Sequence, residues 1–381
     1  MKISLPNFAL PSMASVVSRA TQTAIGVDIG TSSVKIVQLR VESGAIVLDT
    51  YGEISLSAYT KPSSAGETPV LLPQDAGRAL IDLMHEVQIT SRAGGIAIPA
   101  SAAFITVITT PTRDGAQLQT HMDTEMQKYI PVPVNDVYIE WSVLHNKEEQ
   151  NVFATKAAHA EVTATTQQVL VTAVNKDKVE IYRHIFNLAG IAAHFYEIET
   201  VSIARAAFPT SAEPVLLVDM GASSTKMSVI ENDIVYTTHI TLVGGNELTR
   251  SLATASGLPF EKAESLKREW GLHMPHSSSV DTSHLQASLT TPLDLIAEEM
   301  KRVISSFSNS RQKPVSRVIL VGGGACLTGI VDHFSKISIP VEIARPFEKT
   351  RIPIVLGDRL TADGPIFANA IGLALRAITG K

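Results

Sequence analysis

The chain has 381 residues, more than one hydrophobic core usually supports, so two or more lobes are expected. Hydrophobic residues make up 45% and charged residues 18%, a balance that excludes wholesale disorder. Its formal net charge of -5 excludes the cationic surface that sequence-independent binding of nucleic acid requires. The single cysteine excludes an internal disulfide and a cysteine-rich metal site, and it favours a reducing, cytosolic compartment.

The first 22 residues are predicted to form an arm outside the folded lobes. Pro6 and Pro11 interrupt its apolar residues, so neither a signal-peptide core nor a long amphipathic helix is expected there. No apolar run in the sequence approaches the roughly 20 residues that cross a bilayer, and no direct transmembrane segment is predicted.

An internal repeat is the most informative feature of the chain. Residues 25–39 read IGVDIGTSSVKIVQL, and residues 216–230 read LLVDMGASSTKMSVI. Six of the fifteen aligned positions are identical without a gap. Because the copies lie about half a chain apart, they indicate duplication of a whole lobe, whereas solenoid repeats recur every ~20–50 residues.

Each copy predicts a buried strand, a small polar turn and a returning strand. Further strand pattern at residues 45–55 and 234–241 completes three antiparallel strands at the start of each lobe. A helix with one buried face is predicted at residues 75–87.

The segment between the copies has a strand–helix–strand–strand pattern that predicts an inserted subdomain. Its elements are expected at residues 95–109, 117–130, 137–144 and 168–174, with a polar loop at 147–166. The rest of the chain predicts helices at residues 178–189, 244–255, 259–270, 292–309 and 366–378, a Ser/Thr-rich loop at 277–290, and a strand at 318–321.

The repeated turn suits a triphosphate and its metal ion. Gly30 and Gly221 can take positive φ and carry no side chain to block a phosphate. Asp28 and Asp219 are expected to face each other and hold Mg²⁺ through water. The amides and hydroxyls that follow can form an anion-binding concavity, and they belong to Thr31, Ser32, Ser33, Ala222, Ser223 and Ser224.

Two lysines accompany these turns. Lys35 can neutralise phosphate at the end of the first turn, and Lys226 occupies the same place in the second copy. A lone turn of this kind is more often a plain hairpin, and each lysine could equally be a solvated edge residue. Two copies in matched contexts favour phosphate binding.

A third motif reads VILVGGGACLTG at residues 318–329. A strand that enters Gly322, Gly323 and Gly324, followed by Ala325 and a helix expected from about Leu327, would bring backbone against a nucleoside or a phosphate. The motif is neither G-x-G-x-x-G nor a Walker A sequence, so a nicotinamide enzyme is not expected.

Together these motifs resemble the phosphate 1, phosphate 2 and adenosine motifs of the actin-like ATPase superfamily. The segment KYIPVPVNDV at residues 128–137 further resembles the PilM family of type IV pilus assembly proteins. The resemblance extends from about residue 23 to residue 376. It implies an α/β, actin-like (ribonuclease H-like) fold of two duplicated lobes with an inserted SHS2-type subdomain, as in FtsA.

The resemblance also implies a division of the chain. The expected parts are an arm (1–22), the first part of lobe 1 (23–92), the SHS2-type subdomain (93–176), the second part of lobe 1 with a connecting helix (177–210), lobe 2 (211–364, with 245–312 as its helical subdomain), and a C-terminal helix that packs back on lobe 1 (365–381).

The resemblance assigns roles to the site residues. ATP and Mg²⁺ would bind between the lobes. The phosphates and the metal ion would meet Asp28, Gly30, Thr31, Ser32, Ser33 and Lys35 from one lobe and Asp219, Gly221, Ser223 and Ser224 from the other, and the adenosine would meet Gly322 to Ala325. Glu264 and Lys267 fall where the superfamily contacts ribose or base. Glu199, in YEIETVSIARAAF, resembles the residue that positions the attacking water, although the neighbouring Glu197 has the same chemistry. Ala222 departs from the common hydroxyl or glycine, so the second turn would grip through its backbone.

The implied function is a nucleotide-binding scaffold with at most slow ATPase activity. PilM-like proteins hold the cytoplasmic N-terminal tail of the inner-membrane protein PilN, which places them in the cytoplasm at the inner membrane. Contact with the pilus motor ATPases and self-association are further implied partnerships. Two alternatives stay open: a small-molecule kinase of the same superfamily, for which no catalytic aspartate is apparent, and an FtsA-like division filament, whose usual terminal amphipathic helix is not expected here.

Overall fold

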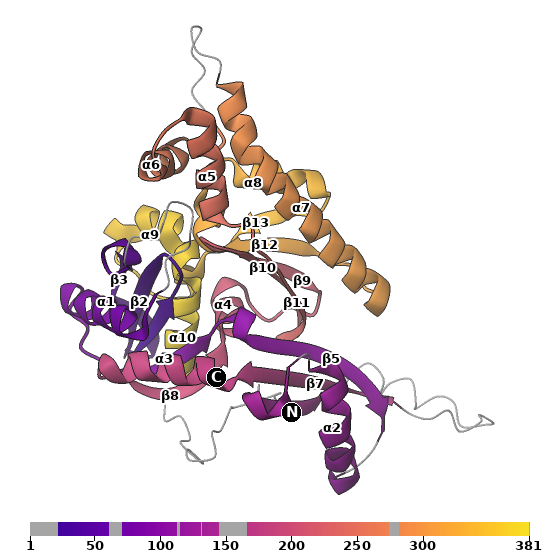
Figure 1. Cartoon of the computed structure of the whole chain (residues 1–381). Helices are drawn as coiled ribbons and strands as arrows, with labels where there is room; N and C mark the ends of the chain where they lie inside the picture. The colour runs from indigo at the N-terminus through magenta and orange to yellow at the C-terminus, as the bar shows by residue number, and fades with distance from the viewer. Residues whose placement is uncertain are drawn as a thin grey trace.

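The computed structural model describes residues 22–60, 71–112, 115–130, 132–144, 166–273 and 282–380. They form two lobes and a smaller unit, each built on its own sheet (Figure 1). The predicted arm at 1–22 lies outside the described residues except for Gln22, and the predicted polar loop at 147–166 does so except for Thr166.

Lobe 1 is built on a five-stranded sheet of order β3-β2-β1-β4-β8. Strands β1 to β3 are antiparallel, whereas β4 and β8 run parallel to β1. Helices α1 and α3 pack on one face and α10 on the other. The bounds are β1 Thr23–Ile29, β2 Ser33–Glu42, β3 Ala45–Ser55, α1 Pro73–Glu86, β4 Ala93–Ile98, α3 Lys176–Leu188, β8 Ala192–Ile198 and α10 Ala368–Thr379.

Lobe 2 repeats this arrangement with the order β11-β10-β9-β12-β13, in which three antiparallel strands are again followed by two parallel ones. Helices α5 to α8 lie on one face and α4 on the other. The bounds are α4 Glu199–Ala207, β9 Val215–Met220, β10 Thr225–Glu231, β11 Ile234–Thr241, α5 Gly245–Ser256, α6 Phe260–Trp270, α7 Ser283–Arg311, β12 Arg317–Val321, α8 Ile330–Phe334 and β13 Val341–Ile343. The shared topology confirms the predicted duplication.

The inserted unit is a three-stranded antiparallel sheet of order β5-β7-β6 with one helix. Its elements are β5 Ala103–Pro111, α2 Gly115–Tyr129, β6 Val137–Leu144 and β7 Thr166–Asn175, in the predicted order. The expected stripe of Leu118, Met122 and Met126 on α2 is buried against one face of the sheet. The other face meets β11 of lobe 2, where Leu170 packs beside Ile234.

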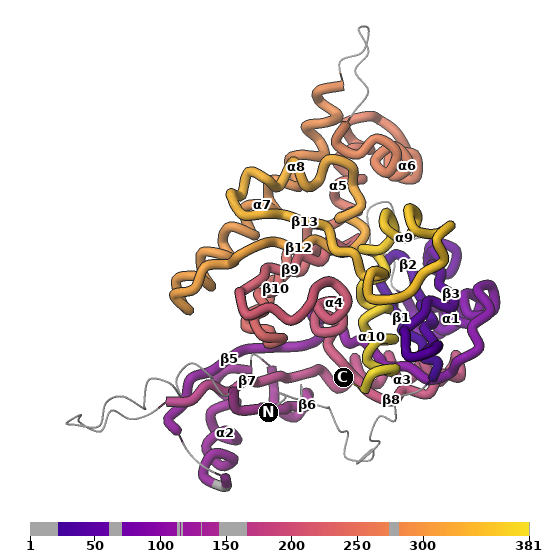
Figure 2. Tube along the Cα trace, turned by 180° about the vertical axis from the view of Figure 1, so that it is seen from behind, coloured from indigo at the N-terminus to yellow at the C-terminus, as the bar shows by residue number. Residues whose placement is uncertain are grey.

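Two helices cross between the lobes. Helix α4 covers the sheet of lobe 2 and α10 covers the sheet of lobe 1, and the two pack against each other (Figure 2). Both views place the C-terminal end of α10 beside the inserted unit. Among the described residues, no helix combines the length and the apolar character that crossing a membrane requires.

Two predicted boundaries need correction. Strand β4 pairs with β1 and β8 in the sheet of lobe 1, so the insertion begins after Ile98 and not at residue 93. Lobe 2 does not extend to residue 364, because Phe347 and Leu360 are buried in the cluster under α10, and Arg351 pairs with Val47 beside β3 of lobe 1. Helix α9, Gly357–Asp363, belongs to this returning segment.

Two predicted elements also differ from the structure. The region 283–290, expected as loop, is the first part of α7, and Pro292 lies inside that helix. No helix begins at Leu327: a 3₁₀ turn covers Gly323–Cys326, and the short α8 starts only at Ile330. Gly322 and Gly329 have φ of 83° and 85°, which interrupts a right-handed helix at both ends of the motif.

Candidate functional site

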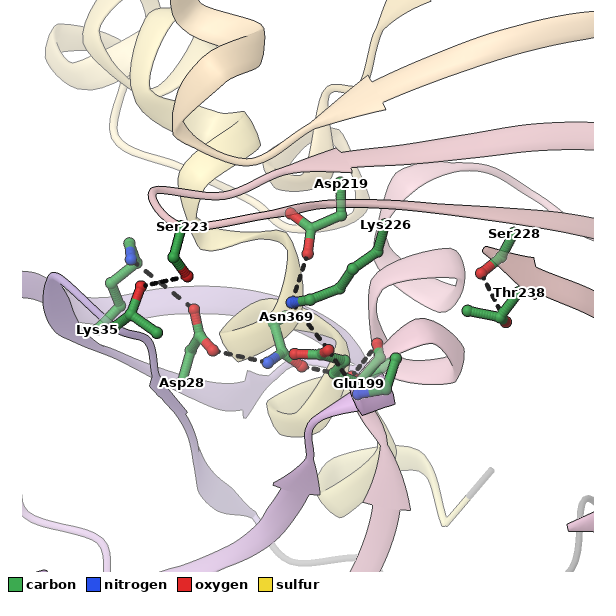
Figure 3. Close-up of polar contacts among 12 residues, drawn as sticks. Asp28, Lys35, Glu199, Asp219, Ser223, Lys226, Ser228, Thr238 and Asn369 are labelled. Carbon is green, nitrogen blue, oxygen red and sulfur yellow. Dashed lines mark hydrogen bonds and ion pairs between the residues drawn. The ribbon is translucent and has the colours of Figure 1, made fainter. Parts of the chain in front are cut away.

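The two repeated turns have the same backbone geometry and meet at the lobe junction. Gly30 N donates to Ser33 O and Gly221 N donates to Ser224 O, both at 3.0 Å. Thr31 Oγ1 and Ser223 Oγ lie 3.1 Å apart, although 192 residues separate them (Figure 3). The structure therefore brings together the two turns that the repeat singled out.

The turn glycines do not use the positive φ that we expected of them. Neither Gly30 nor Gly221 is among the positive-φ residues of the described chain. A Cβ at Gly30 would instead lie 3.2 Å from Ser33 O, and one at Gly221 would lie 3.1 Å from Ser224 O. Close approach of backbone within the turn is thus what favours glycine here.

Each turn is supported by a neighbouring segment. In the first turn, Ser32 O accepts a hydrogen bond from Leu56 N. In the second, Gly221 O accepts from Gly245 N at 2.9 Å and Ala222 O accepts from Asn246 N at 2.7 Å, so the start of α5 holds the turn. These two bonds fix the backbone of the second turn at Gly221 and Ala222.

The first aspartate has a partner on each carboxylate oxygen. Asp28 Oδ1 accepts from Asn369 Nδ2 at 2.8 Å, and Oδ2 lies 3.8 Å from Lys35 Nζ. Lys35 also donates to Ser33 Oγ at 2.8 Å and pairs with Glu53 at 3.6 Å. Lys35 is therefore part of the first turn's polar network and not a free edge residue.

Lys226 joins the second turn to the point where β8 of lobe 1 passes into the crossing helix α4. Its ammonium lies 3.2 Å from Asp219 Oδ2 in its own turn and 2.9 Å from Glu199 Oε1 at the start of α4 (Figure 3). Burial opposes its charge, but Asp219 and Glu199 outweigh that cost and raise the pKa of Lys226. Two carboxylates thus share one buried ammonium.

Glu199, expected to position water, lies in this cluster. It is buried, and Oε1 also accepts a hydrogen bond from Ala100 N at 2.7 Å. Burial raises the pKa of Glu199, and the like charge of Asp219 adds to this effect. The Lys226 ammonium acts in the opposite direction and only partly offsets it. The rival Glu197 points elsewhere, because it pairs with Arg205 and Arg376 at 2.6 Å. Of the two glutamates, only Glu199 contacts the turns.

The triple glycine packs against the second turn. A Cβ at Gly322 would lie 2.6 Å from Asp219 Oδ1, and one at Gly324 would lie 2.6 Å from the Met220 Cβ. The nearest atom to a Cβ at Gly323 is Ile366 Cγ2, 4.0 Å away, and Ala325 is buried. The motif therefore joins the site through contact with β9.

Glu264 and Lys267 stand behind the second turn. Lys267 Nζ donates to Gly245 O at 2.9 Å and to Thr249 Oγ1 at 2.7 Å, and it pairs with Glu264 at 2.6 Å. Burial works against the Glu264 charge, but Lys267, Thr249 and Arg268 outweigh it and lower the pKa of Glu264 to about 2. Both side chains thus contact α5, whose first residues hold the second turn.

Sequence reasoning missed three residues of this site. Gly244 precedes α5, and a Cβ there would lie 2.6 Å from Ser224 N. Asn369 and Ser202 lie on the crossing helices and form the hydrogen bonds behind Asp28. The signals available were the glycine pair after β11 and an asparagine within the apolar run FANAIGLALRA.

Comparison with known structures places the fold. The structure of a PilM-PilN type IV pilus biogenesis complex aligns with a TM-score of 0.73 at 21% identity, covering 94% of this chain and 99% of that chain. The structure of MreB 5 of Spiroplasma citri bound to AMPPNP aligns with a TM-score of 0.52 at 13% identity, covering 92% and 95%. The α/β, actin-like two-lobe fold is thereby confirmed.

Comparison of sequences gives the family. The cell division protein FtsA of Enterococcus faecalis is 27% identical over 175 residues, which is 42% of this chain and 37% of FtsA; that of Neisseria meningitidis is 25% identical over 177 residues, which is 42% and 41%. The chain thus spans only about two fifths of the length of these relatives. The model of the family described as type IV pilus assembly protein PilM instead matches residues 26–378, and the chain belongs to this PilM family.

Proposed function

We propose that this chain binds ATP with Mg²⁺ between its lobes and serves as a nucleotide-dependent scaffold of type IV pilus assembly. The observation that carries the proposal is the contact of Thr31 with Ser223 at 3.1 Å. It puts two glycine-containing turns from opposite lobes at one point, where their amides can share a phosphate chain. The MreB 5 structure with AMPPNP, which has the same fold, supports this reading.

The residues at the junction fit a magnesium–nucleotide complex. Magnesium prefers oxygen ligands and retains several waters, and Asp28 and Asp219 supply carboxylates from opposite lobes. Close packing at Gly322 and Gly244 keeps side chains away from the second turn. When bound, the metal ion would neutralise phosphate charge. Glu199 would orient a water molecule. Glu264 and Lys267, which pack against α5, would contact the ribose or the base.

The charge of the site decides how phosphate would be held. Asp28, Glu199 and Asp219 outnumber Lys35 and Lys226, so the turns do not offer a surplus of cations. Binding of a triphosphate must then rest on the amides of the two turns and on the metal ion. We therefore expect nucleotide affinity to depend strongly on Mg²⁺.

The test is thermal unfolding with and without ligand. ATP at about 100 times its Kd adds roughly 2.7 kcal/mol to the free energy of unfolding, so ATP with Mg²⁺ should raise the melting temperature, and NAD should not. Asp28→Asn should weaken Mg²⁺-dependent binding about tenfold or more. Asp82→Asn, on the surface of α1, is the matched control. A wild-type protein whose melting temperature is the same with saturating ATP and Mg²⁺ would contradict the proposal.

The proposed partner is the cytoplasmic N-terminal tail of a PilN-like inner-membrane protein, which would hold the chain in the cytoplasm at the inner membrane and link that membrane's complex to the pilus motor. Membership of the PilM family and the likeness to a PilM-PilN complex support this part. A pull-down with such tails as immobilised peptides should retain the chain, and a scrambled peptide should not. Equal retention by both peptides would reject the partner while leaving nucleotide binding open.

A further inference from the structure

The C-terminal helix α10 carries one asparagine into the candidate site. Asn369 is 5% exposed, on a helix whose other buried residues are mostly Ala, Leu and Ile. Its Nδ2 donates to Asp28 Oδ1 at 2.8 Å, and its Oδ1 accepts from Ser202 Oγ at 2.5 Å (Figure 3). Both ends of the amide are therefore used, one toward β1 and one toward α4.

Backbone contact on both sides fixes the position of this amide. A Cβ at Gly26 would lie 1.7 Å from Ala370 O, so α10 touches β1 directly, two residues before Asp28. A Cβ at Gly372 would lie 1.8 Å from Ser202 O, so the same helix touches α4. Asn369 directly precedes Ala370, so its backbone is held against β1 close to Asp28.

The hydrogen bond also distinguishes the two oxygens of Asp28. Asn369 occupies Oδ1, whereas the contact of Oδ2 with the Lys35 ammonium is an ion pair at 3.8 Å, which is beyond hydrogen-bond distance. The amide is a neutral donor, so it holds Oδ1 without adding a cation that would repel a metal ion. An ammonium at the same place would compete with Mg²⁺.

We infer that Asn369 is a positioning residue for the metal site: its hydrogen bond to Oδ1 fixes the orientation of the Asp28 carboxylate and presents Oδ2 toward the second lobe for a hydrated Mg²⁺. Ser202 Oγ also lies 2.8 Å from Glu199 O in the first turn of α4, so its single hydroxyl hydrogen is shared between that carbonyl and Asn369 Oδ1. The C-terminal helix is thus part of the site that the proposed function requires, and this inference rests on that function.

The test is a Mg²⁺ titration of binding of a fluorescent ATP analogue. Asn369→Leu, similar in size but without the amide, should raise the Mg²⁺ concentration at half-saturation about tenfold and leave binding in EDTA within about twofold. Ser202→Ala should give a smaller shift in the same direction. Ile378→Val, a buried change at the far end of α10, should lower the melting temperature without moving the Mg²⁺ midpoint.

Asn369→Asp separates positioning from packing, because it keeps the shape and replaces a donor by a carboxylate. The variant places a carboxylate oxygen against Asp28 Oδ1 where the amide donated, so Asp28 loses this hydrogen bond and the Mg²⁺ midpoint should move away from that of wild type although the packing is kept. A wild type that shows Mg²⁺-dependent binding, with Leu and Asp variants of unchanged midpoint, would overturn the inference and leave the proposed function standing. A wild type that binds no nucleotide would overturn both.

Discussion

At the scale of single residues, Lys226 shows how the site is held together in the described structure. It pairs with Asp219 at the end of β9 and with Glu199, which directly follows β8 of lobe 1 and begins α4. Removal of one partner of a buried ion pair costs more than the pair contributes, because a charge is left without a counterion. A metal ion held by Asp219 would also lie near Glu199, so it would compete with the Lys226 ammonium for the same two carboxylates.

Glu140 on β6 gives a prediction about pH. Burial raises the pKa of Glu140 from 4.5 to about 7, with Arg376 acting in the opposite direction, and among the described residues its Oε2 has no hydrogen-bond partner. Because the folded-state pKa lies above the ordinary value, the native protein binds this proton more tightly. Stability should therefore fall as pH rises from about 4.5 through 7.

Glu140→Gln removes that dependence. At pH 8 it should stabilise the protein by about 2 kcal/mol, a figure reduced for the partial exposure of the side chain, and at pH 4.5 the two proteins should be equal. Urea unfolding at the two pH values measures the difference. A glutamine variant that is less stable than wild type at pH 8 would show that the charged carboxylate has a partner there.

At the scale of elements, the crossing of α4 and α10 depends on glycine. A Cβ at Gly372 would lie 1.8 Å from Ser202 O, which is backbone and cannot turn away. Gly372→Ala should therefore force the helices apart and destabilise the protein by about 3 kcal/mol or more. Gly357→Ala is the matched control, since nothing lies within 4 Å of a Cβ there and its effect should be within about 0.5 kcal/mol. Similar unfolding midpoints for the two variants would contradict the described crossing.

Helices and strands that are set by a local sequence pattern could be predicted from the sequence. The repeated hairpins follow from strand patterns around a small polar turn, and the buried stripe of α2 follows from its helical spacing. The first turns of α7 were missed because Ser and Thr resemble loop, although Leu285, Leu289 and Leu293 continue one stripe at every fourth residue. The helix expected at Leu327 was wrong because glycines at positive φ interrupt it.

Contacts between distant segments set the limit of prediction for the site. The repeat located both turns, but the bond between Asn369 and Asp28 joins positions 341 residues apart, and Lys226 reaches Glu199 at the start of α4. Neither follows from a local pattern, since each depends on how α4 and α10 pack. Roles in binding for the turn residues, Glu199, Glu264 and Lys267 remain predictions.

At the scale of the whole molecule, the inserted unit contacts lobe 2 as well as lobe 1. Leu144 and Leu170 pack beside Ile234, and Arg311 of α7 both donates to Gln168 Oε1 at 3.2 Å and lies 4.4 Å above the Tyr236 ring. A movement of one lobe against the other would therefore act on the insertion. This arrangement is how a nucleotide between the lobes could influence a partner bound elsewhere on the molecule.

The proposed nucleotide site depends most on the meeting of the two turns around one triphosphate. Thr31 and Ser223 can be replaced by cysteine in a Cys326→Ser background, which removes the single native thiol. Under mild oxidation the pair should form an intrachain disulfide, and saturating ATP with Mg²⁺ should slow its formation, because phosphates between the turns keep the sulfurs apart. Formation at the same rate with and without bound ATP and Mg²⁺ would contradict the central claim.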